Sequence, residues 1–333
     1  MTNLLRKLIL ISVLNGLACL SHVAAQKPVQ GPPLFEFHNG FWINLHHFIY
    51  NQTLLLHPGK GASMRRLINK DTVELNSLDE TTRQQWLTAI DYYAKNVVSR
   101  DLLFDIGLVK IKNILEDEEN ESVLSGPALP AALETALNGV AQNYRTVFWE
   151  QQKRNNQQWI NLIQLLVQKY GDTLTRELQR LYLSKWPDET IRVDVTNYAS
   201  WSGAYTSLYP NRITISSTDA RNQASAALEI IFHEASHIMI DSISNRIEEI
   251  CRRDNKSLPN SALWHAILFY TTGEVIKWHF PQYMPYGYEN GLWTRAWPMY
   301  IDFLKKDWQP YLMREVPYDS AIEKLVRDVE VTK

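Results

Sequence analysis

The chain has 333 residues, of which 45% are apolar and 21% are charged, and its formal net charge at neutral pH is −2. This composition is ordinary for a globular protein and is long enough for one large domain or two. The sequence has no basic run and no arginine-rich face, so nothing in it points to a nucleic-acid partner.

The first 25 residues are typical of a secretory signal peptide. Arg6 and Lys7 precede an apolar stretch from Leu8 to Leu20, and small residues lead up to Ala25. This stretch is shorter than the ~20 residues that span a bilayer, so we expect cleavage after Ala25 and no transmembrane anchor in the mature chain. The predicted location is secreted or periplasmic. Export as a lipoprotein, with cleavage before Cys19, is the less favoured alternative.

Loss of the signal peptide removes two cations and no anion, which changes the net charge to −4. Cys251 is then the only cysteine of the mature chain, and an internal disulfide is excluded. Stability must come from the core, which 11 tryptophans and 16 tyrosines can fill. No later apolar run reaches membrane-spanning length, so we expect a soluble mature protein, and its oligomeric state is left open.

Residues 26–187 are predicted to form a helical N-terminal region. A linker with three prolines and a glycine, residues 26–33, is followed by a short helix over 41–50. That helix carries adjacent His46 and His47, which point about 100° apart and do not suit one shared metal. Either one of them is packed and the other faces solvent, or one of them lines a catalytic cleft and meets substrate. Helical periodicity predicts five further helices, at 81–98, 102–115, 128–148, 157–170 and 173–183.

The sequence changes character after Pro187. Apolar and polar residues alternate over 191–195, which predicts a strand. Residues 199–210 are predicted to form a loop or irregular hairpin, and residues 212–217 a second strand. We therefore expect a short antiparallel sheet just before a helix that begins near Asp219 or Ala220. The free edge of such a strand can pair with an extended peptide through main-chain hydrogen bonds.

The helix after these strands contains the motif His233-Glu234-x-x-His237 within apolar residues at helical spacing. Side chains at i and i+4 share one helix face, so the two imidazoles can reach one ion, and zinc takes histidine nitrogen at about 2.0–2.1 Å. Glu234, beside the first ligand, can take a proton from a water bound to the metal. The plainer alternative is an ordinary helix with two core histidines, whose buried polar rings would then need other partners.

A catalytic zinc site usually has three protein ligands, so a third is required. A second helix over 261–278 places Glu274 on its apolar face, where a carboxylate needs a metal or a basic partner. Glu274 is therefore the favoured third ligand. His265 is the alternative; it lies nine residues earlier on roughly the opposite face, so both cannot easily reach one metal. Asp241, one turn after His237, is a candidate for orienting a ligand.

This combination of His233-Glu234-x-x-His237 and a later helix with Glu274 resembles the gluzincin metallopeptidases. The resemblance covers about Arg192 to Trp278 and implies zinc held by His233, His237 and Glu274, with Glu234 as general base. It also implies a zincin-like catalytic region with a strand edge that grips substrate. The chain departs from the thermolysin-like pattern at Trp278, where those enzymes have an aspartate that orients a histidine.

Residues 281–300 form an aromatic segment broken by prolines and glycines. Zinc peptidases develop an oxyanion at the attacked carbonyl, and a tyrosine or histidine donor there stabilises it. Tyr286, Tyr288 and His265 are the candidates, and an aromatic loop packed over the core is the alternative. A helical tail is expected over 297–329.

These patterns predict an α+β, predominantly helical protein whose catalytic region spans residues 188–333. We expect an exported zinc-dependent hydrolase, in the first place a metallopeptidase acting on a peptide or protein substrate. One alternative is a zinc amidase that cleaves cell-wall peptide or amide bonds. The other is a non-catalytic binding or structural protein that uses the histidines for a structural metal or for none.

Overall fold

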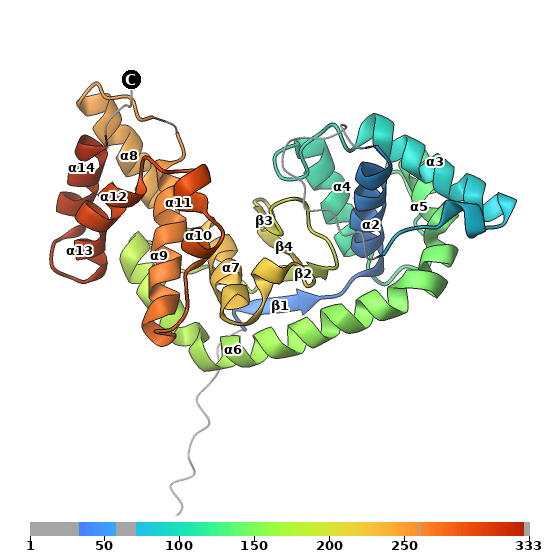
Figure 1. Ribbon diagram of the computed structural model, residues 1–333, viewed down its shortest axis with the longest axis horizontal. Coiled ribbons are helices and arrows are strands. Elements are labelled where there is room, and N and C mark those ends of the chain that lie inside the picture. The colour runs from blue at the N-terminus through green and yellow to red at the C-terminus, as the bar shows by residue number, and fades with distance from the viewer. Residues whose placement is uncertain (1–32, 58–70, 260, 330–333) are drawn as a thin grey trace, which may run out of the picture. The chain divides into compact units, whose positions relative to one another are not determined.

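A computed structural model describes residues 33–57, 71–259 and 261–329 (Figure 1). The described chain from Leu34 onward forms one compact unit. It is an α+β protein that is mostly helical and contains one small mixed sheet, as the sequence predicts at this level. None of the helices in these ranges is both long and apolar enough to cross a bilayer. The predicted signal peptide lies outside the described residues.

The N-terminal helices pack around a core of their own. Asp79 and Asp105 cap two of them by accepting hydrogen bonds from backbone N–H groups of the first turn, which would otherwise lack partners. The predicted helix with His46 and His47 is confirmed and extends six residues further than expected. The elements are α2 (Phe41–Leu56), the 3₁₀ turn η1 (Leu75–Ser77), α3 (Glu80–Asn96), α4 (Ile106–Asp117) and α5 (Ala131–Tyr144).

A long helix, α6 (Glu150–Tyr182), follows a π-helical turn, η2 (Arg145–Trp149). The prediction of two helices over 157–170 and 173–183 is wrong, because Gly171 lies inside α6 and does not interrupt it. A Cβ atom at Gly171 would lie only 2.8 Å from Leu34 Cδ1. The glycine therefore allows a close approach between the helix and the residue that leads into the first strand.

The sheet has four strands in the order β1-β2-β4-β3: β1 (Phe35–His38), β2 (Ile191–Thr196), β3 (Ala204–Ser207) and β4 (Arg212–Ser216). The expected antiparallel pairing of the segments around 191–195 and 212–217 is wrong, because β2 and β4 pair in parallel. The segment expected to be a loop or hairpin contains β3, which runs back along the edge of the sheet antiparallel to β4. This extra strand restores the chain direction before β4 begins. Strand β1 was not predicted.

The two faces of the sheet differ in character, because successive side chains of a strand point to opposite faces. Val193 and Ile213 belong to the apolar core that the sheet shares with α6 and the C-terminal helices. Arg192 and Thr214, one residue away in each strand, face α4 and hydrogen-bond to Glu116. A polar layer thus separates the sheet from the N-terminal core.

A buried ion pair lies in that polar layer. Lys112 Nζ donates to both carboxylate oxygens of Glu116 at 2.7 and 2.8 Å, and the two side chains are 2% and 0% exposed. Arg212 of β4 adds a bond to Glu116 Oε2 at 3.1 Å and contacts the exposed Asp117 at 2.7 Å. With the bond from Thr214, the carboxylate accepts four hydrogen bonds from three partners, which compensate for its removal from water.

The C-terminal half begins with η3 (Ala220–Asn222) and α7 (Ala224–Ser236), which packs on the sheet, on α6 and on α9 (Figure 1). The remaining helices are α8 (Asp241–Arg253), α9 (Leu263–His279), α10 (Tyr286–Glu289), α11 (Leu292–Arg295), α12 (Ile301–Phe303), the π-helical turn η4 (Leu304–Trp308), α13 (Gln309–Leu312) and α14 (Tyr318–Asp328). The predicted second helix and the helical tail are confirmed.

Candidate metal centre

The motif lies at the C-terminal end of α7, where the helix stops at Ser236 and His237 caps it. The rings of His233 and His237 have centroids 5.1 Å apart and are perpendicular, so both remain on one side of the helix end. The chain then turns and starts α8 at Asp241, whose side chain is exposed. The structure therefore does not place Asp241 beside a motif histidine, because the helix that would have carried it along the same face has ended.

Helix α9 runs antiparallel to α7 and supplies the third histidine. The helix pair brings together Glu229 with Gly273, His233 with Phe269, and His237 with His265. His265 Nε2 lies 3.3 Å from His233 Nε2. One ring nitrogen from each of His233, His237 and His265 lies within 4.8 Å of the other two.

This group has the chemistry of a metal site. Burial lowers the pKa of His237 to about 4 and that of His265 to about 3, and it places the pKa of His233 well below its usual value. All three rings are therefore neutral at pH 7, and their lone pairs are available to a cation. Two ligands at about 2.05 Å in tetrahedral geometry are about 3.3–3.4 Å apart, which matches the measured separation of the two Nε2 atoms.

One buried atom of the group has no hydrogen-bond partner among the described residues. His233 Nδ1 is buried and makes no hydrogen bond to any described residue, while the ring of Phe269 stacks on the imidazole at 3.6 Å between centroids. Nε2 faces His265 and is therefore the nitrogen that would bind a metal. In that tautomer Nδ1 carries the proton, and this N–H is buried.

Glu234 is also buried, at the junction of α7 and the edge strand β3. Thr206 Oγ1 lies 2.7 Å from Glu234 Oε2 and 2.8 Å from its backbone oxygen, and its one proton can be donated to either. Burial raises the pKa of Glu234 to about 7, and the Thr206 hydrogen bond opposes the rise. A carboxyl group with a pKa near the working pH can both accept and return a proton.

The structure does not bring Glu274 to the two motif histidines. It lies nine residues beyond His265 on α9, which is about 13 Å along the axis and half a turn around it. There the Glu274 carboxylate interacts with Gln309 and lies near Lys277 and Lys305, while burial raises its pKa. The position expected for Glu274 is occupied by His265.

The two candidate tyrosines are placed differently. Tyr286 stacks on Phe269 at 5.6 Å, and its hydroxyl lies 2.9 Å from Arg221 Nη1. It therefore reaches the histidine group only through the Phe269 ring. Tyr288 lies with Glu274 and beneath Lys305, whose Nζ is 5.4 Å from the ring centroid. The contacts described for the two hydroxyls are thus with Arg221 and with the surroundings of Glu274, not with the histidine group.

His46 and His47 are buried in α2, apart from that group. His46 Nδ1 bonds to the Tyr93 hydroxyl at 2.7 Å. His47 donates from Nδ1 to Ile43 O at 2.9 Å, which leaves Nε2 to accept from the Tyr205 hydroxyl at 3.0 Å. Both rings are buried, so the interpretation of one packed and one solvent-facing histidine is correct for only one of the two.

A pocket of about 440 Å³ lies between α8, the segment after it and the start of α9, and none of the three histidines lines it. Ile247, Leu258 and Trp264 supply apolar walls, and Cys251 lines it as well. Trp264 also lies parallel to His265, with centroids 4.9 Å apart, and edge-on to His237 at 5.7 Å. One indole ring thus forms a wall of the pocket and touches two residues of the group.

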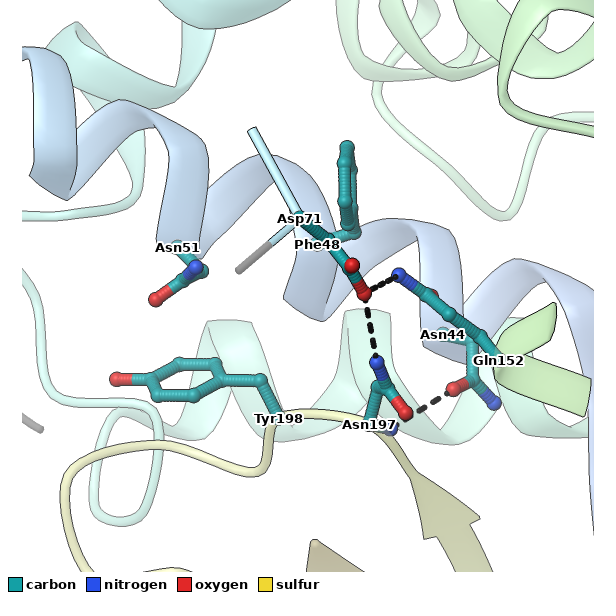
Figure 2. A pocket seen from close by; sticks show the side chains of 7 residues that line it. All are labelled: Asn44, Phe48, Asn51, Asp71, Gln152, Asn197 and Tyr198. Carbon is teal, nitrogen blue, oxygen red and sulfur yellow. Dashed lines mark hydrogen bonds between the residues drawn. The ribbon is translucent and has the colours of Figure 1, made fainter. Parts of the chain in front are cut away.

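A second, much smaller pocket lies at the end of β2, in the polar layer under α2 (Figure 2). Asp71 accepts hydrogen bonds from Gln152 Nε2 at 3.0 Å and Asn197 Nδ2 at 3.2 Å, and Asn44 Oδ1 accepts from the backbone N–H of Asn197. Its volume of about 10 Å³ has room for about one water. These polar bonds tie α2, α6 and the sheet together.

No family model matches the chain, and neither a curated protein nor a solved structure does. Three contributors to the geometry of the site were not identified from the sequence: Glu229, Thr206 and Trp264. Glu229 carried a detectable signal, because it lies four residues before His233 and so on the same helix face.

Proposed function

We propose that the protein is a zinc-dependent hydrolase that cleaves peptide bonds, with His233, His237 and His265 as the metal ligands and Glu234 as the general base. The observation that carries this proposal is the convergence of three neutral imidazole nitrogens within 4.8 Å, next to a buried carboxyl group. Three histidines would leave one position of a tetrahedral zinc to a water, which is the number of protein ligands at a catalytic zinc rather than at a closed structural site.

The chain's own residues would share the chemical work. When bound, zinc would act as a Lewis acid toward the scissile carbonyl and toward the attacking water. Glu234 would hold the proton taken from that water and deliver it to the leaving amine nitrogen. When Thr206 donates to Oε2 of this carboxyl group, Oε1 is the oxygen left to exchange the proton.

The surroundings support an extended peptide as substrate. Strand β3 is an edge strand, and its Thr206 touches the proposed base, so a peptide paired with this edge would pass the site. The pocket walled by Trp264 would take a side chain next to the scissile bond, because Trp264 touches two of the proposed ligands. Its lining combines apolar residues with serines, Glu248 and Lys256, so it would suit a side chain with an apolar body and a polar end.

The test is metal analysis followed by hydrolysis of unfolded protein and of a mixed peptide library. We expect about one zinc per chain, loss of hydrolysis with a chelator and recovery with added zinc. Glu234→Gln should bind zinc normally and lose hydrolysis, while Glu249→Gln, an exposed change on α8, should behave as wild type.

Two outcomes would overturn the proposal. A folded chain without zinc affinity would leave a protein of another kind, and unchanged turnover in Glu234→Gln would remove the base. Cleavage of cell-wall peptides without cleavage of unfolded protein would instead favour the amidase, with the same ligands and base.

A further inference from the structure

We infer that Glu229 is a positioning residue for the metal ligand His233, and that one buried water connects the Glu229 carboxylate to the Nδ1–H of that ring. This inference rests on the proposed metal site and assigns it a partner outside the ligand set. The observation behind it is a pair of buried polar atoms without a partner among the described residues: His233 Nδ1 and Glu229 Oε1.

The two atoms belong to residues that share one face of α7. Glu229 precedes His233 by four residues, which places their side chains about one turn apart, with Cβ atoms about 5–6 Å from each other. Helical side chains lean toward the N-terminus, so the imidazole of His233 leans toward Glu229. Both side chains face α9, where Glu229 Oε1 lies against Gly273 and the His233 ring lies against Phe269.

The other contacts of both groups fix their roles. Glu229 Oε2 accepts a hydrogen bond from the Tyr283 hydroxyl at 2.7 Å and another from the backbone N–H of Tyr286 at 2.9 Å. This oxygen is fully used, so Oε1 remains to accept. His233 Nε2 faces His265, so Nδ1 is the nitrogen that must carry the proton when the ring binds a metal.

The two orphan atoms make no direct hydrogen bond to each other, so the inferred link between them is a bridging water. A water that accepts from Nδ1–H and donates to Oε1 satisfies both atoms. Metal-bound histidines nearly always donate their second N–H to a carboxylate, a carbonyl or a water, and the loss of that partner weakens metal binding about 10–100-fold. The sequence pattern Glu229-x-x-x-His233-Glu234-x-x-His237 thus contains two proposed ligands, a base and an orienting group, on α7 and its C-cap.

Replacement of Glu229 by glutamine gives a sharp test. Tyr283 and the backbone N–H of Tyr286 are both donors, so the amide oxygen must take the Oε2 position and the NH₂ group must face the water. The water can then no longer donate there. The matched control is Glu274→Gln, which removes a partly buried carboxylate from the neighbouring helix without changing a contact of His233.

We expect Glu229→Gln to bind zinc about 10–100-fold more weakly than wild type in a chelator competition, with an unchanged melting temperature of the metal-free protein. The absorption spectrum of the cobalt-substituted variant should also shift. Glu274→Gln should change neither measurement. A purely structural Glu229 would lower the melting temperature and leave the zinc affinity of the folded protein unchanged, and that result would overturn the inference.

A measurement on the wild-type chain keeps the inference testable if the variant fails to fold. In the zinc-loaded protein, the His233 Nδ1–H proton should give a protected NMR signal with an exchange or NOE contact to a bound water. A signal that exchanges at the solvent rate would overturn the inference. If wild-type protein binds no zinc, the proposed function fails; if it binds zinc and Glu229→Gln binds it equally well, only this inference fails.

Discussion

The Nε2 atoms of His233 and His265 lie 3.3 Å apart, although the two residues are separated by 32 positions and belong to different helices. Such proximity of two neutral ring nitrogens places two lone pairs, or one lone pair and one N–H, against each other. A cation between them turns this contact into a stable arrangement. The relationship therefore identifies His265, and not Glu274, as the residue able to complete the group begun by His233 and His237.

Removal of the third histidine should separate these two candidates directly. We expect His265→Ala to lose zinc affinity by more than about 100-fold, because the loss of a ligand should exceed the 10–100-fold effect of losing an orienting group. Glu274→Gln should keep the wild-type affinity. Isothermal titration of the metal-free proteins measures both. Loss of zinc from Glu274→Gln with retention by His265→Ala would reverse the assignment.

The periodicity of the sequence predicted the main helices and the motif, since apolar spacing and the i, i+4 rule are local properties. The sequence also predicts that His265 and Glu274 cannot both bind one metal, because a separation of nine residues places two side chains on opposite faces of a helix. The choice between them depends on which face of α9 meets α7. That choice depends on how two antiparallel helices pair, which no local pattern in the sequence specifies.

Other differences have similar causes. Helix α7 ends at Ser236 although no glycine or proline follows until Pro259, so local signals predicted a continuous helix past Asp241. At Gly171 the local signal predicted a helix end, but the helix continues, and the glycine permits close packing against Leu34. The parallel pairing of β2 with β4 depends on the short edge strand β3, which lies in a segment rich in Ser, Tyr and Gly.

The buried base should make the metal-free protein less stable as the pH rises. The pKa of Glu234 is about 7 in the folded chain and about 4.5 when unfolded, so the folded state holds its proton more tightly. Ionisation above the unfolded value therefore lowers the free energy of unfolding, by about 3 kcal/mol at pH 8 and about 1 kcal/mol at pH 5. Glu234→Gln should recover that difference, since its amide oxygen still accepts from Thr206.

Urea unfolding of the metal-free proteins at both pH values measures this effect. We expect the variant to exceed wild type by a few kcal/mol at pH 8 and by much less at pH 5. An equal difference at the two pH values would show that the folded carboxyl group has an ordinary pKa.

The pocket beside Trp264 can be tested by filling it. Cys251 lines this pocket and is partly buried, so Cys251→Trp would occupy space that the proposal assigns to a substrate side chain. We expect kcat/KM for peptides to fall by about tenfold or more, which corresponds to the 1–3 kcal/mol that one hydrophobic contact contributes to specificity. Zinc content should stay unchanged, and Cys251→Ser should remain within about twofold of wild type. Unchanged kcat/KM in the tryptophan variant would place the substrate elsewhere.

In the polar layer between the sheet and α4, one arginine, Arg212, contacts both a buried and an exposed carboxylate. Arg212 contacts both Glu116, which is 0% exposed, and Asp117, whose side chain is 57% exposed. Glu116→Gln leaves Lys112 buried without a counter-charge, and the loss of one member of a buried pair destabilises a protein by about 3–5 kcal/mol. Asp117→Asn removes only a solvent-screened contact, whose contribution is about 0–1 kcal/mol.

Thermal or urea unfolding of these two variants should therefore separate them clearly, with Glu116→Gln far less stable than Asp117→Asn. Replacement of both Lys112 and Glu116 by leucine should recover much of the loss, since buried pairs can be exchanged for apolar residues at little cost. Equal destabilisation by the two single variants would mean that water reaches Glu116. The polar layer would then contribute no more than a surface ion pair, and the attachment of the sheet to the N-terminal helices would depend on the apolar contacts alone.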